Sequence, residues 1–447
     1  MILCGETDSV TTLAELLEHQ AATIPSRTAF LCESSRHTYF TLNRAADQVA
    51  DALIRSGVQS GQRVAFWGRN CLEALELIFG AAKMGAVPVM INWRLNTREA
   101  AFILADSGAR VAVVDSVVAD GLDAGLVNTV PLILHAGAGG TYEHWRQNAA
   151  KSGSGEHRAF VGTPDDTALQ LYTSGTTGNP KGVLLTNENW KASTAAHRTM
   201  LEMDEHTVQL IALPLFHIGG LILALTSLLA GSVTILASNG DPRLMVKMIR
   251  EERVSHLPTV PTLLASLLEE AESEPASLRS LRAICYGSAP MPEGLLQRAM
   301  SMLRADLLSG YGMTETTATV TFLQFHDHQA ANRPDATAAE RQRLKSAGRV
   351  GPGAEIMIVD PQTFDEVPPG CHGEVLVRGT QVMAGYWDRH HGNADVVSPQ
   401  GWIRTGDGGY IDEDGYLFLT DRIKDMIITG GENVYPAEIE AVVADMP

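Results

Sequence analysis

The amino-acid sequence predicts an α/β protein: a large N-terminal domain of two sheet-and-helix layered subdomains, a small β-barrel-like subdomain, and the start of a truncated C-terminal α+β domain. Apolar strand-like stretches alternate with amphipathic helical stretches, which indicates parallel sheets covered by helices on both faces. From Val350 onward, short alternating stretches between Gly and Pro turns indicate antiparallel strands. The length of 447 residues also exceeds one ordinary domain.

The first subdomain is expected over residues 1–166. Thr12 and Glu15 form a capping-box pattern, so a helix is expected to begin there and to stop near Pro25. Further helices are expected around the apolar face of Leu42, Ala46, Val49 and Leu53, at Leu72–Met84 and at Thr97–Asp106. Strands are expected at Thr28–Cys32, Arg63–Trp67, Val87–Ile91, Arg110–Asp115 and Pro131–His135. The polar segment Ala136–Asp166 is expected to be an exposed connection.

The second subdomain is expected over residues 167–349. Asp241 and Pro242 form an N-cap followed by proline at the first helical position. Helices are expected at Thr186–Met203, Ile218–Ala230, Arg243–Glu252 and Thr259–Glu272. Strands are expected at Ala168–Leu171, Val208–Leu213, Ser232–Ala237 and Leu281–Tyr286. The polar, Ala-rich segment Ala330–Lys345 is interpreted as a mobile loop.

The β-barrel-like subdomain is expected over residues 350–421, with strands in Ala354–Asp360, Gly373–Arg378 and Gly409–Thr420. Asp412–Gly415 is interpreted as a hairpin turn, because it lacks the later ligands of a calcium loop. The segments His326-Asp327-His328 and His390-His391 have no matching partners in the sequence and are expected to be solvated. Residues 422–447 are expected to form a hinge and the beginning of a further domain.

Composition limits the classes of partner. The formal net charge of −18 disfavours nucleic acid and acidic membranes. No apolar stretch reaches the roughly 18–20 residues of a membrane span, and the N-terminus lacks a signal-peptide pattern. Five widely spaced cysteines indicate reduced thiols in a cytoplasmic protein, and they argue against a zinc site. Composition leaves the oligomeric state open.

The segment Tyr172–Gly182, with the sequence YTSGTTGNPKG, has the residue types of a phosphate-binding loop. Glycines let backbone N–H groups face an oxyanion, hydroxyls add donors, and a lysine supplies a compact positive charge. It is not the usual nucleotide P-loop, because Pro180 precedes Lys181 and Gly182 follows it. The predicted phosphate-binding residues are Thr173, Ser174, Gly175, Thr176, Thr177, Gly178 and Lys181.

This loop resembles the signature of the adenylate-forming superfamily, which includes AMP-dependent acyl-CoA synthetases. A second segment, Leu308–Glu315, is similar to the superfamily's adenine-binding motif. The resemblance implies that Tyr311 lies against adenine, that Thr314 contacts the α-phosphate, and that Glu315, with Thr176, holds Mg²⁺. The nucleotide-binding segments that the resemblance implies are Gly310, Tyr311, Gly312, Met313 and Thr314, with Ser288, Ala289 and Pro290 as the other wall of the adenine slot.

The resemblance also implies that Asp407 and Arg422 bind the ribose, that Lys424 is a hinge, and that Gly431 lines the thiol tunnel. His217 resembles the gating residue beside the acyl pocket, although a lone histidine is often only a satisfied polar group. Amino-acid-activating relatives carry an aspartate in this region. The segment Pro214–Gly220 has none, so a simple carboxylic acid is favoured over an amino acid.

The function that follows is ATP- and Mg²⁺-dependent activation of a fatty or aryl acid to acyl-AMP, followed by transfer to coenzyme A. Lys181, Thr176, Glu315 and His217 are the expected catalytic residues. The chain ends at Pro447, before the superfamily's C-terminal lysine motif, so slow adenylation is expected. Two alternatives remain: an adenylating enzyme that loads a carrier protein's phosphopantetheine, and a non-catalytic module that binds nucleotide or acyl-AMP.

Overall fold

The computed structural model describes residues 10–33, 35–119, 129–137, 139–151, 160–173, 179–387, 396–398, 400–423, 427–429 and 432–434. The chain divides into two compact units. The first contains residues 1–198, 203–240 and 383–389, and the second contains residues 199–202, 241–382 and 390–447. The division does not follow chain order, because the short segment 383–389 belongs to the first unit while the chain on both sides of it belongs to the second.

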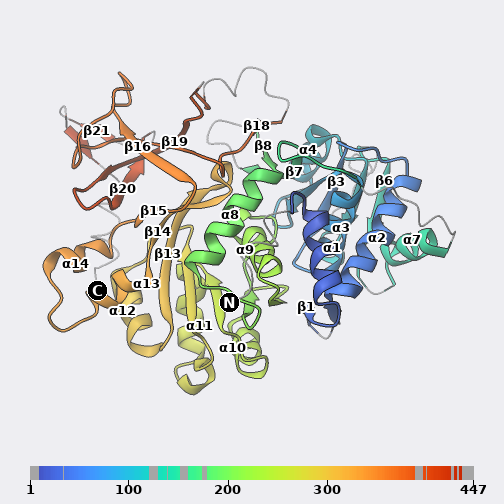
Figure 1. Cartoon of the computed structure of the whole chain (residues 1–447), viewed down its shortest axis with the longest axis horizontal. Helices are drawn as coiled ribbons and strands as arrows, with labels where there is room; N and C mark the ends of the chain where they lie inside the picture. Colours follow the sequence, from blue (N-terminus) through green and yellow to red (C-terminus); the bar gives the residue numbers. More distant parts are fainter. Residues whose placement is uncertain are drawn as a thin grey trace. The chain divides into compact units, whose positions relative to one another are not determined.

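One sheet of the first unit carries the expected alternation of strands and helices (Figure 1). In the described part of the chain its strand order is β18-β8-β7-β4-β3-β5-β6. Its parallel strands are β3 (Arg63–Gly68), β4 (Val87–Asn92), β5 (Val111–Val114), β6 (Leu132–His135) and β7 (Thr167–Thr173). Antiparallel β8 (Lys181–Thr186) and β18 (Gly385–Tyr386) extend one edge. Parallel strands bring their carboxyl ends to one edge of the sheet, which is where ligands usually bind.

The other strands of the first unit run in the order β9-β10-β1-β2. They are β1 (Thr28–Cys32), β2 (Ser35–Thr38), β9 (Val208–Ile211) and β10 (Val233–Leu236). The helices of this unit are α1 (Leu13–Thr23), α2 (Tyr39–Arg55), α3 (Leu72–Met84), α4 (Thr97–Ser107), α5 (Ser116–Ala119), α7 (Thr141–Lys151), α8 (Asn187–Met200) and α9 (Ile218–Leu229). The capping box at Thr12 and the buried face of α2 are both confirmed.

In the second unit, the strands β15-β14-β13-β12-β11 are neighbours in that order. They are β11 (His256–Thr259), β12 (Ala283–Gly287), β13 (Asp306–Met313), β14 (Ala318–Leu323) and β15 (Arg349–Val350). The helices are α10 (Pro242–Glu251), α11 (Pro261–Glu270), α12 (Glu293–Met302), α13 (Phe325–Ala331) and α14 (Ala338–Arg343), with 3-10 turns η2 (Pro275–Leu278) and η3 (Thr314–Thr316). Asp241 caps α10 and Pro242 is its first residue, as predicted.

The expected antiparallel strands after Val350 form a sheet in the order β16-β17-β19-β20. They are β16 (Ala354–Val359), β17 (Gly373–Gly379), β19 (Ile403–Ile411) and β20 (Leu417–Arg422). A turn at Asp412–Gly415 joins β19 to β20, and the Gly415 N–H donates to the Asp412 carbonyl at 3.0 Å, so the hairpin interpretation is confirmed. A short hairpin, β21 (Ile427–Thr429) and β22 (Glu432–Val434), follows.

Several sequence predictions are wrong. The connection expected at Ala136–Asp166 contains helix α7, because Tyr142 supplies a buried anchor. The loop expected at Ala330–Lys345 contains helix α14, which Thr337 caps. Strands β8 and β11 were missed, because short apolar stretches beside a helix carry no periodicity of their own.

The solvated environment expected for His326-Asp327-His328 is also wrong for two of these residues. His328 is buried, and its Nε2 lies 2.8 Å from the Tyr286 hydroxyl. Asp327 is buried and accepts a hydrogen bond from the Tyr416 hydroxyl at 2.6 Å. His326 itself is exposed, with 66% of its side chain accessible. His390 and His391 lie outside the described residues.

The expected boundary at residue 166 is not the boundary of a sheet. Strands β7 and β8 follow it in the sequence, yet β7 pairs with β4 of the first range. Strands β1 and β10 also pair across the two ranges. The sheets are therefore not divided at residue 166. The domain limits remain predictions, at 1–166, 167–349, 350–421 and 422–447.

Candidate functional site

The predicted phosphate loop joins the carboxyl end of β7 to the start of β8. Thr173 ends β7, Lys181 begins β8, and these two residues are register partners in the antiparallel pair. The loop is therefore followed by a strand and not by a helix, as the mismatch with the usual P-loop indicated. Five predicted residues lie outside the described part of the chain: Ser174, Gly175, Thr176, Thr177 and Gly178.

The glycines of the second motif are required by close contacts between backbones. Gly310 lies opposite Gly287 on parallel β12, and a Cβ on Gly287 would come within 2.6 Å of the Gly310 carbonyl oxygen. A Cβ on Gly312 would come within 1.7 Å of the Ala318 carbonyl oxygen. Neither position admits a side chain without movement of the backbone.

The proposed walls of the adenine slot lie at the carboxyl ends of two adjacent parallel strands. Ser288, Ala289 and Pro290 follow β12, and Tyr311 lies one residue beyond the Gly287–Gly310 register pair on β13. Ser288 has φ +66°, a left-handed conformation that turns the chain sharply away from the strand. The fold therefore places these two segments side by side. At the sequence level, only the family resemblance linked them.

Tyr311 is linked to both predicted ribose-binding residues. Its hydroxyl donates to Asp407 Oδ2 at 2.6 Å, and Arg422 Nε lies 2.9 Å from Asp407 Oδ1. Burial raises the pKa of Tyr311 well above its ordinary value, and the adjacent Asp407 carboxylate raises it further. Burial also raises the pKa of Asp407, whereas the Tyr311 hydrogen bond and Arg422 act in the opposite direction.

A turn of three residues orients the Asp407 carboxylate. The Thr405 hydroxyl accepts a hydrogen bond from the Asp407 N–H at 3.0 Å and donates to the Val375 carbonyl at 2.8 Å. Glu374, which is only 2% exposed, accepts from the Gly406 N–H at 3.3 Å. Glu374 was missed at the sequence level, although a charged residue inside the apolar strand β17 is a usable signal.

Glu315 occupies a sharply turned segment. It is 5% exposed and lies in the 3-10 turn η3. The two residues that follow this turn, Thr317 and Ala318, have positive φ angles of 49° and 78°. The Thr317 hydroxyl donates to the Gln381 carbonyl at 2.6 Å and fixes this turn. Within the described residues, no group of three or more His, Cys, Asp or Glu side chains is arranged to hold a metal ion.

His217 belongs to the first unit and precedes helix α9. Its ring packs against Phe216, with 4.4 Å between the ring centroids, while part of the side chain remains exposed. Surrounding protein atoms lower the pKa of His217 by desolvation, and the positive charge of Arg94 lowers it further. Both effects favour the neutral imidazole, which lies at the start of an almost entirely buried apolar helix.

The predicted residues divide between the two units. Thr173, Lys181 and His217 belong to the first unit, whereas Ser288–Pro290, Gly310–Glu315, Asp407 and Arg422 belong to the second. Lys424 and Gly431 lie outside the described residues. Within the second unit, Tyr311 of the predicted adenine slot contacts Asp407, which is predicted to bind the ribose.

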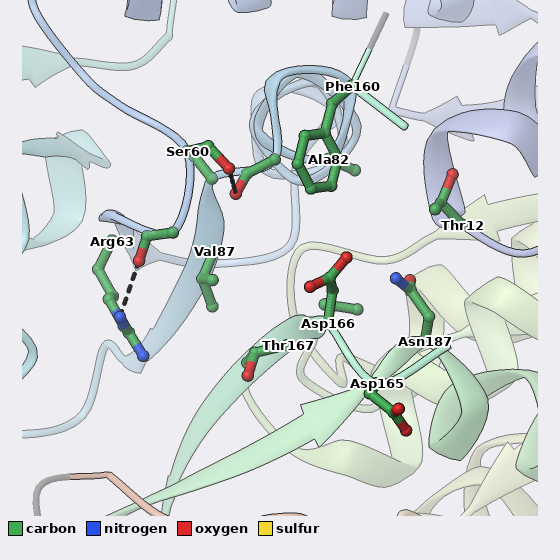
Figure 2. A pocket seen from close by; sticks show the side chains of 14 residues that line it. Thr12, Ser60, Arg63, Ala82, Val87, Phe160, Asp165, Asp166, Thr167 and Asn187 are labelled. Atoms are coloured by element: carbon green, nitrogen blue, oxygen red, sulfur yellow. Dashed lines mark hydrogen bonds between the residues drawn. The ribbon is translucent and has the colours of Figure 1, made fainter. Parts of the chain in front are cut away.

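A cavity of about 300 Å³ in the first unit lies away from the predicted loop (Figure 2). Its lining includes Arg63, Val87 and Thr167, the first residues of β3, β4 and β7. The loop follows the other end of β7, roughly 20 Å away at about 3.3 Å per residue. The cavity therefore lies at the opposite edge of the sheet from the predicted phosphate loop.

An α/β fold with glycine-rich segments at the ends of β7 and β13 and a buried tyrosine–carboxylate pair is typical of nucleotide-binding enzymes. The AMP-binding enzyme family matches residues 17–387. The chain belongs to this family. In the described part of the chain, no helix combines the length and the apolar composition that crossing a membrane requires.

Three relatives illustrate the breadth of the family. The chain is 34% identical to the fatty acid–[acyl-carrier-protein] ligase ScoC of Streptomyces coeruleorubidus over 443 residues, 98% of this chain and 82% of that protein. It is 36% identical to feruloyl-CoA synthase of Amycolatopsis sp over 431 residues, 93% of this chain and 79% of that protein. The structure of o-succinylbenzoate CoA synthetase from Bacillus subtilis with its acyl-adenylate intermediate superimposes with a TM-score of 0.84 at 31% identity, covering 97% of this chain and 83% of that one.

These similarities define the activity at the level of the family. The chain is an AMP-forming acid–thiol ligase, which activates a carboxylic acid as an acyl adenylate and transfers the acyl group to a thiol. The ATP-bound structure of MatB from Rhodopseudomonas palustris is also similar, with a TM-score of 0.85 at 28% identity, and covers 97% of this chain and 84% of that one.

Proposed function

We propose that the activated acid is a simple fatty or aryl carboxylic acid and that coenzyme A is the acceptor. The observation that carries this proposal is the Phe216–His217 ring pair at the start of the apolar helix α9. An amino-acid substrate needs a carboxylate to pair with its α-ammonium group, and the segment Pro214–Gly220 contains none. The positive charge of Arg94 near His217 further disfavours an ammonium group there.

The names of the relatives include both classes of acid and two kinds of acceptor. ScoC is named for a fatty acid and an acyl-carrier protein, whereas feruloyl-CoA synthase is named for an aryl acid and coenzyme A. Loading of a carrier protein is therefore the second candidate function. Gly219 supports an extended acid, because a Cβ built there meets nothing within 4 Å.

In the proposed reaction, a carboxylate oxygen of the acid attacks the α-phosphorus of ATP and pyrophosphate leaves. Tyr311 supplies a stacking face for adenine, Asp407 and Arg422 bind the ribose hydroxyls, and Thr314 contacts the α-phosphate. Ser174, Thr176, Thr177 and Lys181 bind the β- and γ-phosphates. Because no covalent enzyme intermediate is needed, catalysis comes from alignment and charge neutralisation.

Glu315 is the proposed protein ligand of Mg²⁺, together with Thr176. A buried carboxylate on a rigid turn fits this ion, because Mg²⁺ is usually bound by one or two carboxylates together with phosphate oxygens and water. When bound, the ion would neutralise phosphate charge. The turn η3 holds the Glu315 carboxylate in place. The hydrogen bond from the Thr317 hydroxyl to the Gln381 carbonyl fixes the conformation of this turn.

The test measures pyrophosphate release from ATP by the full chain with octanoate, ferulate, phenylalanine or no acid. The proposal predicts release with octanoate or ferulate and none above background with phenylalanine. Selective release with phenylalanine would overturn it. A second arm supplies either coenzyme A or a phosphopantetheinylated carrier protein: acyl-CoA formation supports the main proposal, and exclusive acylation of the carrier supports the second candidate.

A further inference from the structure

The segment from residue 383 to 387 is joined to the strand that begins with Lys181. Tyr386 pairs with Val183 and Gly385 with Leu184 in the antiparallel register of β18 and β8. On either side of this pair, the Ala384 N–H donates to the Leu184 carbonyl at 3.0 Å, and the Trp387 N–H donates to the Gly182 carbonyl at 2.7 Å. The edge strand is therefore fixed at the residue immediately after Lys181.

Both aromatic side chains of this segment face a cation. Lys181 Nζ lies 5.0 Å from the centroid of the Tyr386 ring, and Arg63 Cζ lies 3.4 Å from the centroid of the Trp387 ring. Successive strand residues point to opposite faces, so each ring serves a different cation. Tyr386 is only 8% exposed, so packing holds its ring in place.

Among the described residues, Lys181 forms no ion pair with a carboxylate, and its ammonium group lies over the Tyr386 ring. A flexible ammonium side chain loses rotamer freedom when it binds phosphate. If an aromatic ring already holds the ammonium group, less rotamer freedom is lost when phosphate binds. The positive charge stays available, because an aromatic face attracts a cation without neutralising it.

We infer that Tyr386 is a positioning residue for ATP binding, which holds Lys181 at the start of β8 before the nucleotide arrives. The inference rests on the phosphate-binding role proposed for Lys181. Tyr386 does not touch the substrate in this role. It acts through the lysine, and Trp387, which follows β18 and faces Arg63, does not take part.

The experiment compares Tyr386→Phe, Tyr386→Leu, Lys181→Ala and the double variant Lys181→Ala/Tyr386→Leu in the full chain. ATP affinity is measured by calorimetry, and kcat and KM for ATP are measured by pyrophosphate release. Tyr386→Phe keeps the ring and stays within about twofold of the parent. Tyr386→Leu weakens ATP binding and lowers kcat/KM for ATP by about five- to thirtyfold, the range expected from loss of a cation–π contact.

A double-mutant cycle separates positioning from a general structural role. If Tyr386 acts through Lys181, Tyr386→Leu has no further effect on ATP affinity once Lys181 is alanine. Trp387→Leu is the matched control, because it disturbs the same edge strand and is expected to lower thermal stability without changing ATP affinity. Equal loss of ATP affinity in Trp387→Leu and Tyr386→Leu, or additive effects in the double variant, would overturn the inference.

The same set of variants distinguishes this inference from the proposed function. If Lys181→Ala binds ATP as the parent does, the phosphate-binding role of Lys181 fails and the positioning role fails with it. If Lys181→Ala loses ATP affinity while Tyr386→Leu keeps it, only the positioning role fails.

Discussion

The Tyr311 hydroxyl donates a hydrogen bond of 2.6 Å to the carboxylate of Asp407, a residue on a different sheet of the same unit. The two residues come from motifs 96 positions apart in the sequence. The bond holds an aromatic ring and a carboxylate in one orientation, as simultaneous contact with a base and a ribose requires. Each residue thereby limits the conformations of the other before any nucleotide binds.

This relationship predicts different effects for three variants. Asp407→Ala removes the proposed ribose acceptor and is expected to raise KM for ATP by about tenfold to a hundredfold, as for lost hydrogen bonds to a charged group. Tyr311→Ala removes the stacking face and is expected to lower ATP affinity by about 1–3 kcal/mol. Tyr311→Phe keeps the ring and is expected to have a smaller effect than either. Calorimetric titration with ATP checks all three, and an unaltered affinity in Asp407→Ala would exclude the ribose role.

Gly312 is predicted to tolerate no side chain. Its Cβ would lie 1.7 Å from the carbonyl oxygen of Ala318, a backbone atom in a left-handed residue that cannot move cheaply. Gly312→Ala is therefore expected to lower the free energy of unfolding by about 3 kcal/mol. Denaturant unfolding measures the loss.

Gly294→Ala is the matched control for Gly312→Ala, because nothing lies within 4 Å of a Cβ there and the residue is in helix α12 of the same unit. It is expected to be neutral or to stabilise the protein by up to about 1 kcal/mol. A Gly312→Ala variant as stable as Gly294→Ala would show that β13 and β14 are not packed as described.

His197 is predicted to make stability depend on pH. Burial lowers its pKa to about 4, and its Nδ1 lies 2.7 Å from the Ser193 carbonyl oxygen. The unfolded chain takes up a proton near pH 6.5 and the folded chain only near pH 4, so stability falls as the pH falls through this window. From pH 7 to pH 5, this residue alone is expected to cost about 2 kcal/mol.

The pH effect is checked by unfolding the parent and His197→Gln at several pH values. The substitution is expected to lower stability at pH 7, because the site is fully packed, but also to flatten the dependence between pH 7 and pH 5. The comparison therefore uses the slopes and not the absolute values. Identical slopes in the two proteins would assign the pH dependence to other groups.

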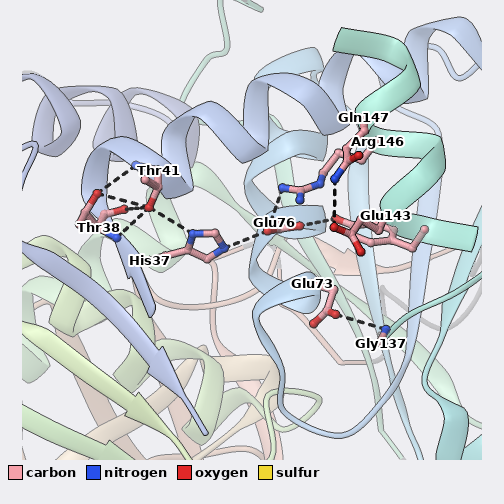
Figure 3. Close-up of polar contacts among 10 residues, drawn as sticks. His37, Thr38, Thr41, Glu73, Glu76, Gly137, Glu143, Arg146 and Gln147 are labelled. Carbon is pink, nitrogen blue, oxygen red and sulfur yellow. Dashed lines mark hydrogen bonds and ion pairs between the residues drawn. The ribbon is translucent and has the colours of Figure 1, made fainter. Parts of the chain in front are cut away.

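Glu76 is predicted to be the main polar determinant of stability in the first unit (Figure 3). Its carboxylate is buried on α3, where Oε1 lies 2.9 Å from His37 Nε2 and accepts from Arg146 at 3.1 Å, while Oε2 accepts from the Tyr142 hydroxyl at 3.0 Å. Glu76→Ala leaves a buried hydroxyl and a guanidinium without their acceptor. The expected loss is about 3–5 kcal/mol of unfolding free energy.

Glu73→Ala is the control for Glu76→Ala on the same helix. Glu73 is less buried and accepts a hydrogen bond from the Gly137 N–H at 3.2 Å, so its loss is expected to cost about 1 kcal/mol or less. The melting temperatures of the two variants, measured by thermal unfolding, should therefore differ clearly. Equal losses would mean that the Glu76 network contributes no more than a partly exposed contact.

Local sequence patterns predicted most elements, because caps and amphipathic periodicity act over only a few residues. The capping box at Thr12, the proline at the start of α10 and the buried face of α2 were all predicted from such patterns. Helix α7 was missed for the opposite reason: its sequence is polar, and it is anchored by buried Tyr142, whose partner Glu76 is 66 residues away.

The sequence by itself determined the family, through two glycine-rich motifs, and it predicted the kinds of residue that bind a nucleotide. Only the tertiary structure decided which residues orient them. Tyr386 lies beside Lys181 and Glu374 supports the Asp407 turn because strands distant in the sequence pair edge to edge. Such pairing depends on the packing of whole sheets, and no local pattern of side chains specifies it.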